Sequence, residues 1–195
     1  MEKYLYLNKL EHVETWINGG EIPINLASKH KANIRKGTKT PDENLIYDSD
    51  VPISEFSKYG ISISENMHFQ NFTISNNTIN GVLAPEIYNA NRYMSDGLVL
   101  CLCNHFDSET AKLFGDKVAC VKILSIEKTK KKLDKRLGLK GEMRDCEYTD
   151  SHQRNHFLKS AKDKWQDEFR VFWKGNKMRM VKIPAGTAEL VWKLE

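Results

Sequence analysis

Apolar and polar positions alternate in short runs along much of the chain, which predicts short strands. Residues 4–10 and residues 21–27 each mix β-forming apolar residues with polar ones, and we expect a strand in both places. Between them, Val13, Trp16 and Ile17 share one face of a predicted helix over residues 12–17. The run 18–20, Asn-Gly-Gly, supplies residues that accept positive φ angles and should end this helix.

The rest of the chain continues as strands with short helices between them. Residues 97–104 are apolar on both faces, which is typical of a buried central strand. Asp107 is a favoured N-cap residue and Gly115 a favoured C-terminal residue, so a short helix is expected between them. The remaining expected elements are a strand over 118–124, a basic helix over 126–137 stopped by Gly138, a strand over 165–173 and a terminal hairpin ending near Trp192. This order favours an α+β domain over a doubly wound sheet.

Two polar stretches interrupt this series. Residues 28–44 are predicted to form a long surface loop, and such loops are more often functional than idle. Residues 53–82 are rich in Ser, Asn and Ile and suggest short strands, with Asn80-Gly81 as the strongest turn signal. We interpret the segment from about 53 to 95 as a β insertion within one domain that spans residues 1–195.

The composition is that of a globular protein with a mild basic surplus. Of 195 residues, 29% are charged and 40% are hydrophobic, and 30 basic residues stand against 26 acidic ones. A net charge of +4 permits a nucleic-acid partner without requiring one. The first residues do not resemble a signal peptide, and no apolar run approaches the length of a membrane helix. We therefore expect a cytoplasmic protein with reduced cysteines and no membrane partner.

The predicted strand over residues 165–173 carries the strongest chemical signal. One of its faces is apolar and should belong to the core sheet, whereas the other presents Gln166, Glu168 and Arg170. The simplest interpretation is a solvated face on which Glu168 and Arg170 form a surface ion pair, worth about 0–1 kcal/mol. The alternative is that this row of polar groups lines a functional site.

The spacing of Gln166 and Glu168 resembles the Gln-x-Glu motif of the ADP-ribosyltransferase superfamily. Residues 4–20 are similar to the start of the DarT-like toxins of that superfamily. Residues 157–170, with Lys159, Trp165, Glu168 and Arg170, are similar to the C-terminal signature of a large uncharacterised bacterial family, itself a plausible relative of these enzymes. The resemblance implies a mainly antiparallel, split β-sheet core flanked by short helices, and NAD as a substrate.

The resemblance also implies catalytic roles for three residues. Glu168, held against the ribose 2′-hydroxyl of NAD, would stabilise the positive charge that develops when the nicotinamide–ribose bond breaks. Gln166 would hold or orient the acceptor nucleophile. Arg35, in the polar loop, would pair with the pyrophosphate or orient the acceptor.

Three further residues are implied in binding NAD. Tyr6 stands where the family has a histidine in its first strand, and no arginine lies in that strand either, so the sequence departs from the family there. Tyr6 could instead stack on the nicotinamide, with Asn8 forming a hydrogen bond nearby. Ser28 follows the second strand, where relatives place a small hydroxyl residue.

These roles describe an intracellular enzyme of toxin or phage-defence type that modifies a macromolecule. The basic balance and the DarT-like start favour nucleic acid, DNA or RNA, over protein as acceptor, and a toxin would need a neutralising antitoxin partner. One alternative is a metal-dependent nuclease in which Asp42 or Asp163 joins Glu168 around a magnesium ion. The other is a non-catalytic interaction module whose polar strand face is solvated.

Weaker signals point to structure more than to chemistry. The four cysteines lack the paired spacing of zinc sites and are interpreted as buried thiols: Cys101, Cys103, Cys120 and Cys146. His152 and His156 lie four residues apart, but the glutamate of the zinc-protease motif is absent. The dense basic run over 128–136 is interpreted as the solvated face of a helix, with non-specific attraction to a polyanion as the alternative.

Overall fold

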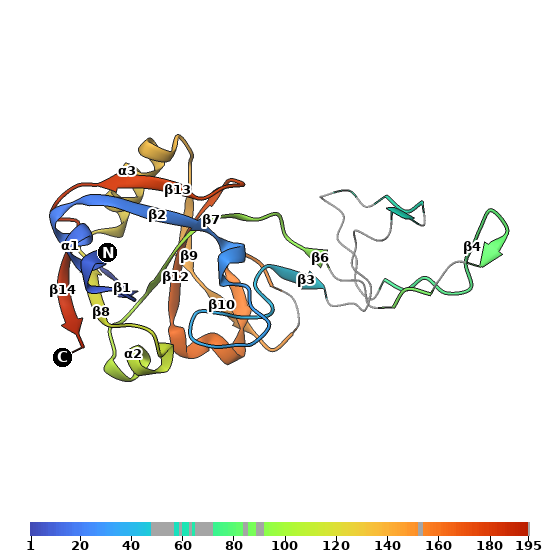
Figure 1. The fold of residues 1–195 in the computed structure, drawn as a ribbon, viewed down its shortest axis with the longest axis horizontal. Helices are drawn as coiled ribbons and strands as arrows, with labels where there is room; N and C mark the ends of the chain where they lie inside the picture. The colour runs from blue at the N-terminus through green and yellow to red at the C-terminus, as the bar shows by residue number, and fades with distance from the viewer. Residues whose placement is uncertain are drawn as a thin grey trace.

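The computed structural model describes residues 1–47, 57–58, 60–62, 64, 72–83, 86–88, 92–151 and 154–194. These residues form an α+β fold with a mainly antiparallel sheet and few helices, as expected (Figure 1). None of the helices in these ranges is both long and apolar enough to span a membrane.

One large sheet organises the fold. Its central path runs β13-β2-β7-β1-β8-β14, and β12 branches from β7 and carries β9 on its far side. The strands of this sheet are β1 (Lys3–Leu7), β2 (Gly20–Leu26), β7 (Gly97–Cys103), β8 (Ala119–Ile123), β9 (Glu142–Asp145), β12 (Glu168–Lys174), β13 (Arg179–Ile183) and β14 (Ala188–Lys193).

Short helices and small strand pairs complete the described fold. The helices are α1 (Leu10–Asn18), α2 (Ser108–Phe114) and α3 (Ile126–Leu137), with 3-10 turns η1 (Ala27–His30) and η3 (Ala161–Gln166). The small pairs are β3 (Leu45–Tyr47) with β6 (Arg92–Tyr93), β4 (Thr78–Ile79) with β5 (Val82–Leu83), and the parallel pair of β10 (Glu147–Thr149) and β11 (Leu158–Ser160).

Strand β7 is the point at which the sheet splits. Along one edge it pairs with β12 over its whole length, from Gly97 opposite Lys174 to Cys103 opposite Glu168. Along the other edge, β2 pairs only with Leu98 and Val99, and β1 pairs only with Cys103. Residues 20–24 of β2 pair with β13 instead, and all five residues of β1 pair with β8. No described strand therefore pairs with residues 100–102 on this edge.

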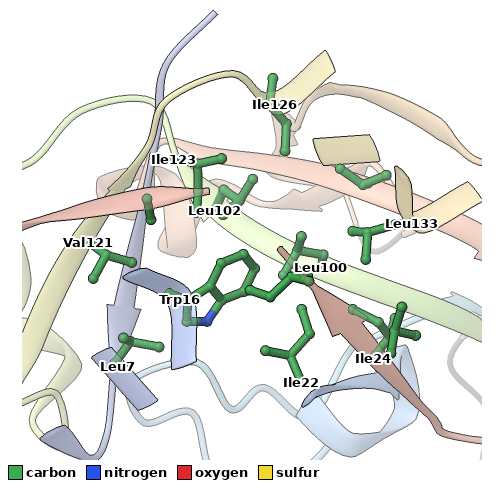
Figure 2. Close-up of a cluster of buried hydrophobic side chains, with 14 of the residues drawn as sticks. Leu7, Trp16, Ile22, Ile24, Leu100, Leu102, Val121, Ile123, Ile126 and Leu133 are labelled. Carbon is green, nitrogen blue, oxygen red and sulfur yellow. The ribbon is translucent and has the colours of Figure 1, made fainter. Parts of the chain in front are cut away.

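The main hydrophobic core lies on one face of the sheet. Trp16 of α1 is 3% exposed and packs among apolar side chains from β1, β2, β7 and β8 (Figure 2). Helix α3 adds Ile126 and Leu133, both fully buried. The apolar face of β12 completes this core with Phe169, Val171 and Trp173. Burial of this face explains why the apolar periodicity of the helices and of β12 could be recognised in the sequence.

Several local predictions agree with the structure. The side chain of Asp107 accepts a hydrogen bond from the Thr110 backbone N–H and caps α2, while Gly115 takes a left-handed conformation at its end. Helix α3 ends at Gly138, which is also left-handed. Asn80-Gly81 forms the turn between β4 and β5, both residues having positive φ. Much of the remaining predicted insertion, including Ile63 and Phe69, lies outside the described residues.

Two predictions near the C-terminal end of the chain are wrong. The last two strands form no hairpin, because β13 pairs with β2 and β14 with β8, at opposite ends of the sheet path. The strand predicted over 165–173 begins at Glu168 instead, since Gln166 ends a 3-10 turn and Asp167 is left-handed with φ of 40°. Two hydrogen bonds from Asn104 hold this turn. Its side-chain amide donates to the Asp167 carboxylate, and its backbone N–H donates to the Asp167 carbonyl oxygen.

Replacing Gly97 with alanine should destabilise the fold. A Cβ at this position would lie 2.8 Å from the Trp173 carbonyl oxygen and would overlap the Phe172 ring. Overpacking of this kind costs about 1–3 kcal/mol or more. Gly175→Ala is the control, since its Cβ would come no closer than 3.3 Å to any atom, and its nearest neighbours are side-chain atoms of Leu98 and Leu139. Urea unfolding should show the larger loss for Gly97→Ala, and equal losses would contradict this account of the β7–β12 packing.

Candidate functional site

A cavity of about 480 Å³ lies at the split between β1 and β2. This volume is within the usual range of small-molecule sites. Its walls come from β1, β2 and the part of β7 that has no partner on that edge, including Leu100 and Cys101. Tyr6, Gln166 and Glu168 all line it, so the structure brings three of the six proposed site residues together.

Glu168 lies at the polar end of this cavity, within a buried ion-pair network. Its side chain is only 6% exposed, and its carboxylate accepts hydrogen bonds from Arg170 Nε at 2.5 Å and from Lys159 Nζ. Arg170 also donates to both carboxylate oxygens of Glu43, at 2.7 and 3.2 Å, and to the His156 carbonyl oxygen. The solvated strand face considered in the sequence is therefore wrong: Glu168 and Arg170 do pair, but inside the protein.

The network keeps its carboxylates ionised. Burial alone would raise the pKa of Glu168, but the nearby Arg170 guanidinium and Lys159 ammonium more than offset this and hold it well below its ordinary value. The pKa of Glu43 is lowered in the same way, since Arg170 outweighs the effect of burial. Burial would lower the pKa of Lys159, yet Glu168 and Glu43 raise it. Two carboxylates thus neutralise two cations in a site with little water.

Gln166 contacts the same ammonium group as Glu168. Its side-chain oxygen accepts a hydrogen bond from Lys159 Nζ at 2.6 Å, and its amide nitrogen donates to the Gly37 carbonyl oxygen at 3.0 Å. The two residues do not lie on one strand face, as the sequence suggested, because the left-handed Asp167 separates them. The turn nevertheless directs both side chains to Lys159 and to the cavity.

Tyr6 also lines the cavity and lies within a cluster of aromatic rings. Its ring centroid lies 5.1 Å from that of Phe114 and 6.2 Å from that of Phe106. Its hydroxyl donates to the Asp107 carbonyl oxygen and accepts from the Asp107 backbone N–H, each at 3.0 Å. Burial raises the pKa of Tyr6 well above its ordinary value, so this hydroxyl stays protonated. Both polar functions of the Tyr6 hydroxyl are therefore engaged with the Asp107 backbone.

The other three proposed residues lie outside the cavity wall. Arg35 forms a second ion-pair network with Asp42 at 2.7 Å and with Asp163, and Arg154 also donates to Asp42 at 2.9 Å. Asn8 is exposed just past the end of β1, where it donates to Asp116 and accepts from Lys117. Ser28 is exposed in η1, and its backbone N–H donates to Asp96.

Sequence reasoning missed several polar groups around the cavity. Lys159 was part of the resemblance but was not among the proposed site residues, and His30 and Lys117, which also line the cavity, were not considered. Glu43 was missed because it lies in a polar loop and belongs to no motif or periodic pattern that could have singled it out. The side chain of Lys117 is only 9% exposed, and this burial lowers its pKa. Its ammonium donates to Asn8 Oδ1 at 2.6 Å.

The weaker signals have structural explanations within the described residues. Cys103, Cys120 and Cys146 are buried free thiols, and Cys101 is partly buried. In the described part of the chain, no group of three or more His, Cys, Asp or Glu side chains is placed to hold a metal ion. The carboxylates of the nuclease alternative are divided between two ion-pair networks, Asp42 and Asp163 with Arg35 and Glu168 with Arg170.

The two histidines four residues apart cannot be compared, because His152 lies outside the described residues. His156 is buried and stacks on Phe172, with ring centroids 3.8 Å apart. In α3, the lysines of the basic run at 128, 131, 132 and 135 are exposed, as expected for a solvated helix face. Lys130 instead pairs with Asp134 at 2.6 Å.

No protein-family model, curated protein or solved structure matches this chain. The site is therefore interpreted from its own geometry.

Breaking the buried network should cost much more stability than breaking a surface pair. Glu43→Gln leaves Arg170 with one charged partner fewer in a site where that guanidinium is almost fully buried. Loss of one partner of a buried pair costs about 3–5 kcal/mol. Glu189→Gln, which removes a half-exposed partner of Lys122, should cost about 0–1 kcal/mol. Urea unfolding of both variants measures the difference, and similar losses would contradict the account of the network.

The same network predicts acid sensitivity. The folded state lowers the pKa values of Glu43 and Glu168, so the unfolded state binds more protons in acid. The stabilisation is fully present well above the ordinary glutamate value of 4.5 and is lost progressively as pH falls below it. Urea unfolding between pH 7 and pH 3 should show this fall, and Glu43→Gln should reduce its size. An unchanged slope in Glu43→Gln would show that other groups cause it.

Proposed function

We propose that the protein is an NAD-dependent ADP-ribosyltransferase of toxin or phage-defence type that modifies a macromolecule. The observation that carries this proposal is the position of Glu168: an ionised carboxylate on the wall of a cavity that residues of the first strand also line. The resemblance of Gln166 and Glu168 to the Gln-x-Glu motif is compatible with that position, since both side chains line the same cavity.

The chemistry requires a negative charge that stays in place. Breaking the nicotinamide–ribose bond of NAD creates positive charge on the ribose carbon, and an ionised carboxylate close to the ribose stabilises that charge electrostatically. Glu168 is kept ionised by Arg170 and Lys159, and these contacts also restrict its position. Each carboxylate oxygen has a second lone pair, so Glu168 can still accept a hydrogen bond from a ribose hydroxyl.

Other parts of the cavity have the chemistry that a dinucleotide requires. The ring of Tyr6, beside Phe114, offers an aromatic surface for the planar nicotinamide. Lys117 lies on the same side and can contribute positive charge for the phosphates. The side chains of Gln166 and Glu168 both accept a hydrogen bond from Lys159 Nζ, so they lie close together. In this arrangement Gln166 contacts the acceptor while Glu168 contacts the ribose.

The acceptor is proposed to be nucleic acid in preference to protein. The net charge of +4 and the exposed lysines of α3 favour approach of a polyanion. Arg35, which the sequence placed beside the acceptor or the pyrophosphate, lies outside the cavity wall and would act there only on a bound macromolecule. Such an enzyme would need an antitoxin partner in the cell that makes it.

Radiolabelled NAD tests the proposal directly. Wild-type protein incubated with labelled NAD and either DNA, RNA or a cell extract should transfer label to one of these acceptors. Glu168→Gln should reduce the transfer by at least a hundredfold, since losing one group that stabilises transition-state charge costs about 10²–10³ in rate. When water replaces the macromolecule as acceptor, the reaction is hydrolysis of NAD, and chromatography of the released nicotinamide measures its rate.

Glu43→Gln is the matched control. It removes a carboxylate from the same Arg170 but from a position outside the cavity wall, so it should destabilise the protein and still transfer label. Assays are performed at a temperature at which circular dichroism shows both variants to be folded. Equal activity of wild type and Glu168→Gln, or no consumption of NAD by wild type, would refute the proposal.

A further inference from the structure

The proposed reaction needs a base, and Glu168 is poorly suited to be one. When an acceptor hydroxyl or amino group attacks the ribose carbon, it must lose a proton. Glu168 already accepts hydrogen bonds from two cations, and both lower the pKa of its carboxyl. A carboxylate held in this way stabilises charge well but takes up a proton poorly. If the proposed function holds, another group must accept the proton.

His30 is placed to be that group. It lies at the end of η1, directly after β2, and it lines the same cavity as Cys101, Lys159 and Glu168. Its Nε2 atom is 3.9 Å from Cys101 Sγ, which places the ring over β7 next to the split. His12 is the other histidine on the wall, but it belongs to α1 and is half-exposed.

The surroundings of His30 keep its imidazole neutral. Burial lowers the pKa of His30, and the charged groups that face it largely cancel, because Glu43 and Glu168 oppose Arg170 and Lys159. Cys101, on the neighbouring strand β7, is itself held as a thiol because burial raises its pKa. A neutral imidazole at pH 7 can accept a proton, whereas a protonated one cannot.

We infer that His30 is the general base of the transfer reaction, taking the proton from the acceptor nucleophile at the wall of the cavity that also carries Glu168. The acceptor O–H or N–H bond breaks as the new bond to the ribose carbon forms, and the proton moves to a ring nitrogen of His30. The bond from the ribose carbon to nicotinamide breaks at the same time. Its electron pair leaves with nicotinamide and neutralises the pyridinium nitrogen, so no other reactant is needed.

The pH dependence of transfer tests this inference. In wild type, the rate should be constant near neutral pH and should fall in acid, as His30 becomes protonated below the ordinary histidine range. His30→Gln should be slower by about a hundredfold or more, because general-base catalysis typically contributes 10²–10⁴. The transfer rate of His30→Gln should also no longer fall in acid as the wild-type rate does. In His30→Ala, added imidazole should restore part of the rate, which a purely structural role would not explain.

His156→Gln is the matched control, because burial lowers the pKa of His156 as it does that of His30, but His156 lies outside the cavity wall. It should keep the wild-type pH profile. A wild-type rate with no fall in acid, or His30→Gln with the wild-type rate and profile, would overturn the inference while leaving the proposed function standing, provided that Glu168→Gln is inactive. No NAD consumption by wild type would overturn both.

Discussion

The ion pairs around Glu168 are the interaction on which the site depends. Removing a charge from water costs several kcal/mol, so this carboxylate can be buried only because Arg170 and Lys159 contact it directly. These partners come from different elements: Arg170 from β12 and Lys159 from β11, with Glu43 contributed by the polar loop before β3. The same contacts that keep the charge in place therefore join the loop and the small parallel pair to the sheet.

The cavity lies where β7 has no partner strand along part of one edge. Backbone N–H and C=O groups need partners, and residues 100–102 give up strand pairing on one edge. Beyond their short contacts with β7, β2 runs along β13 and β1 runs along β8. The split and the ion pairs are thus complementary: one opens a space in the middle of the fold, and the other places a charge on its wall.

Features determined by neighbouring residues could be predicted from the sequence, and those determined by distant contacts could not. The helix over 126–137 was predicted with its observed bounds because its apolar face and terminal glycine are local signals. The start of β12 was misjudged because the left-handed Asp167 depends on Asn104, far away in the chain. Gln166 and Glu168 could be proposed from a short motif, but Glu43 could not, because only the fold brings it to Arg170.

The pairing of β2 with β13 also has a consequence for how the protein is made. Ile24 pairs with Arg179, so one wall of the split is supported by a strand synthesised 155 residues later. Contacts so distant in sequence slow folding, because a long loop must close before they form. On the ribosome, β1, β2 and β7 emerge well before β12, which carries Glu168 and Arg170, and before β13, which pairs with β2. The cavity can therefore assemble only after residues 166–183 have been synthesised.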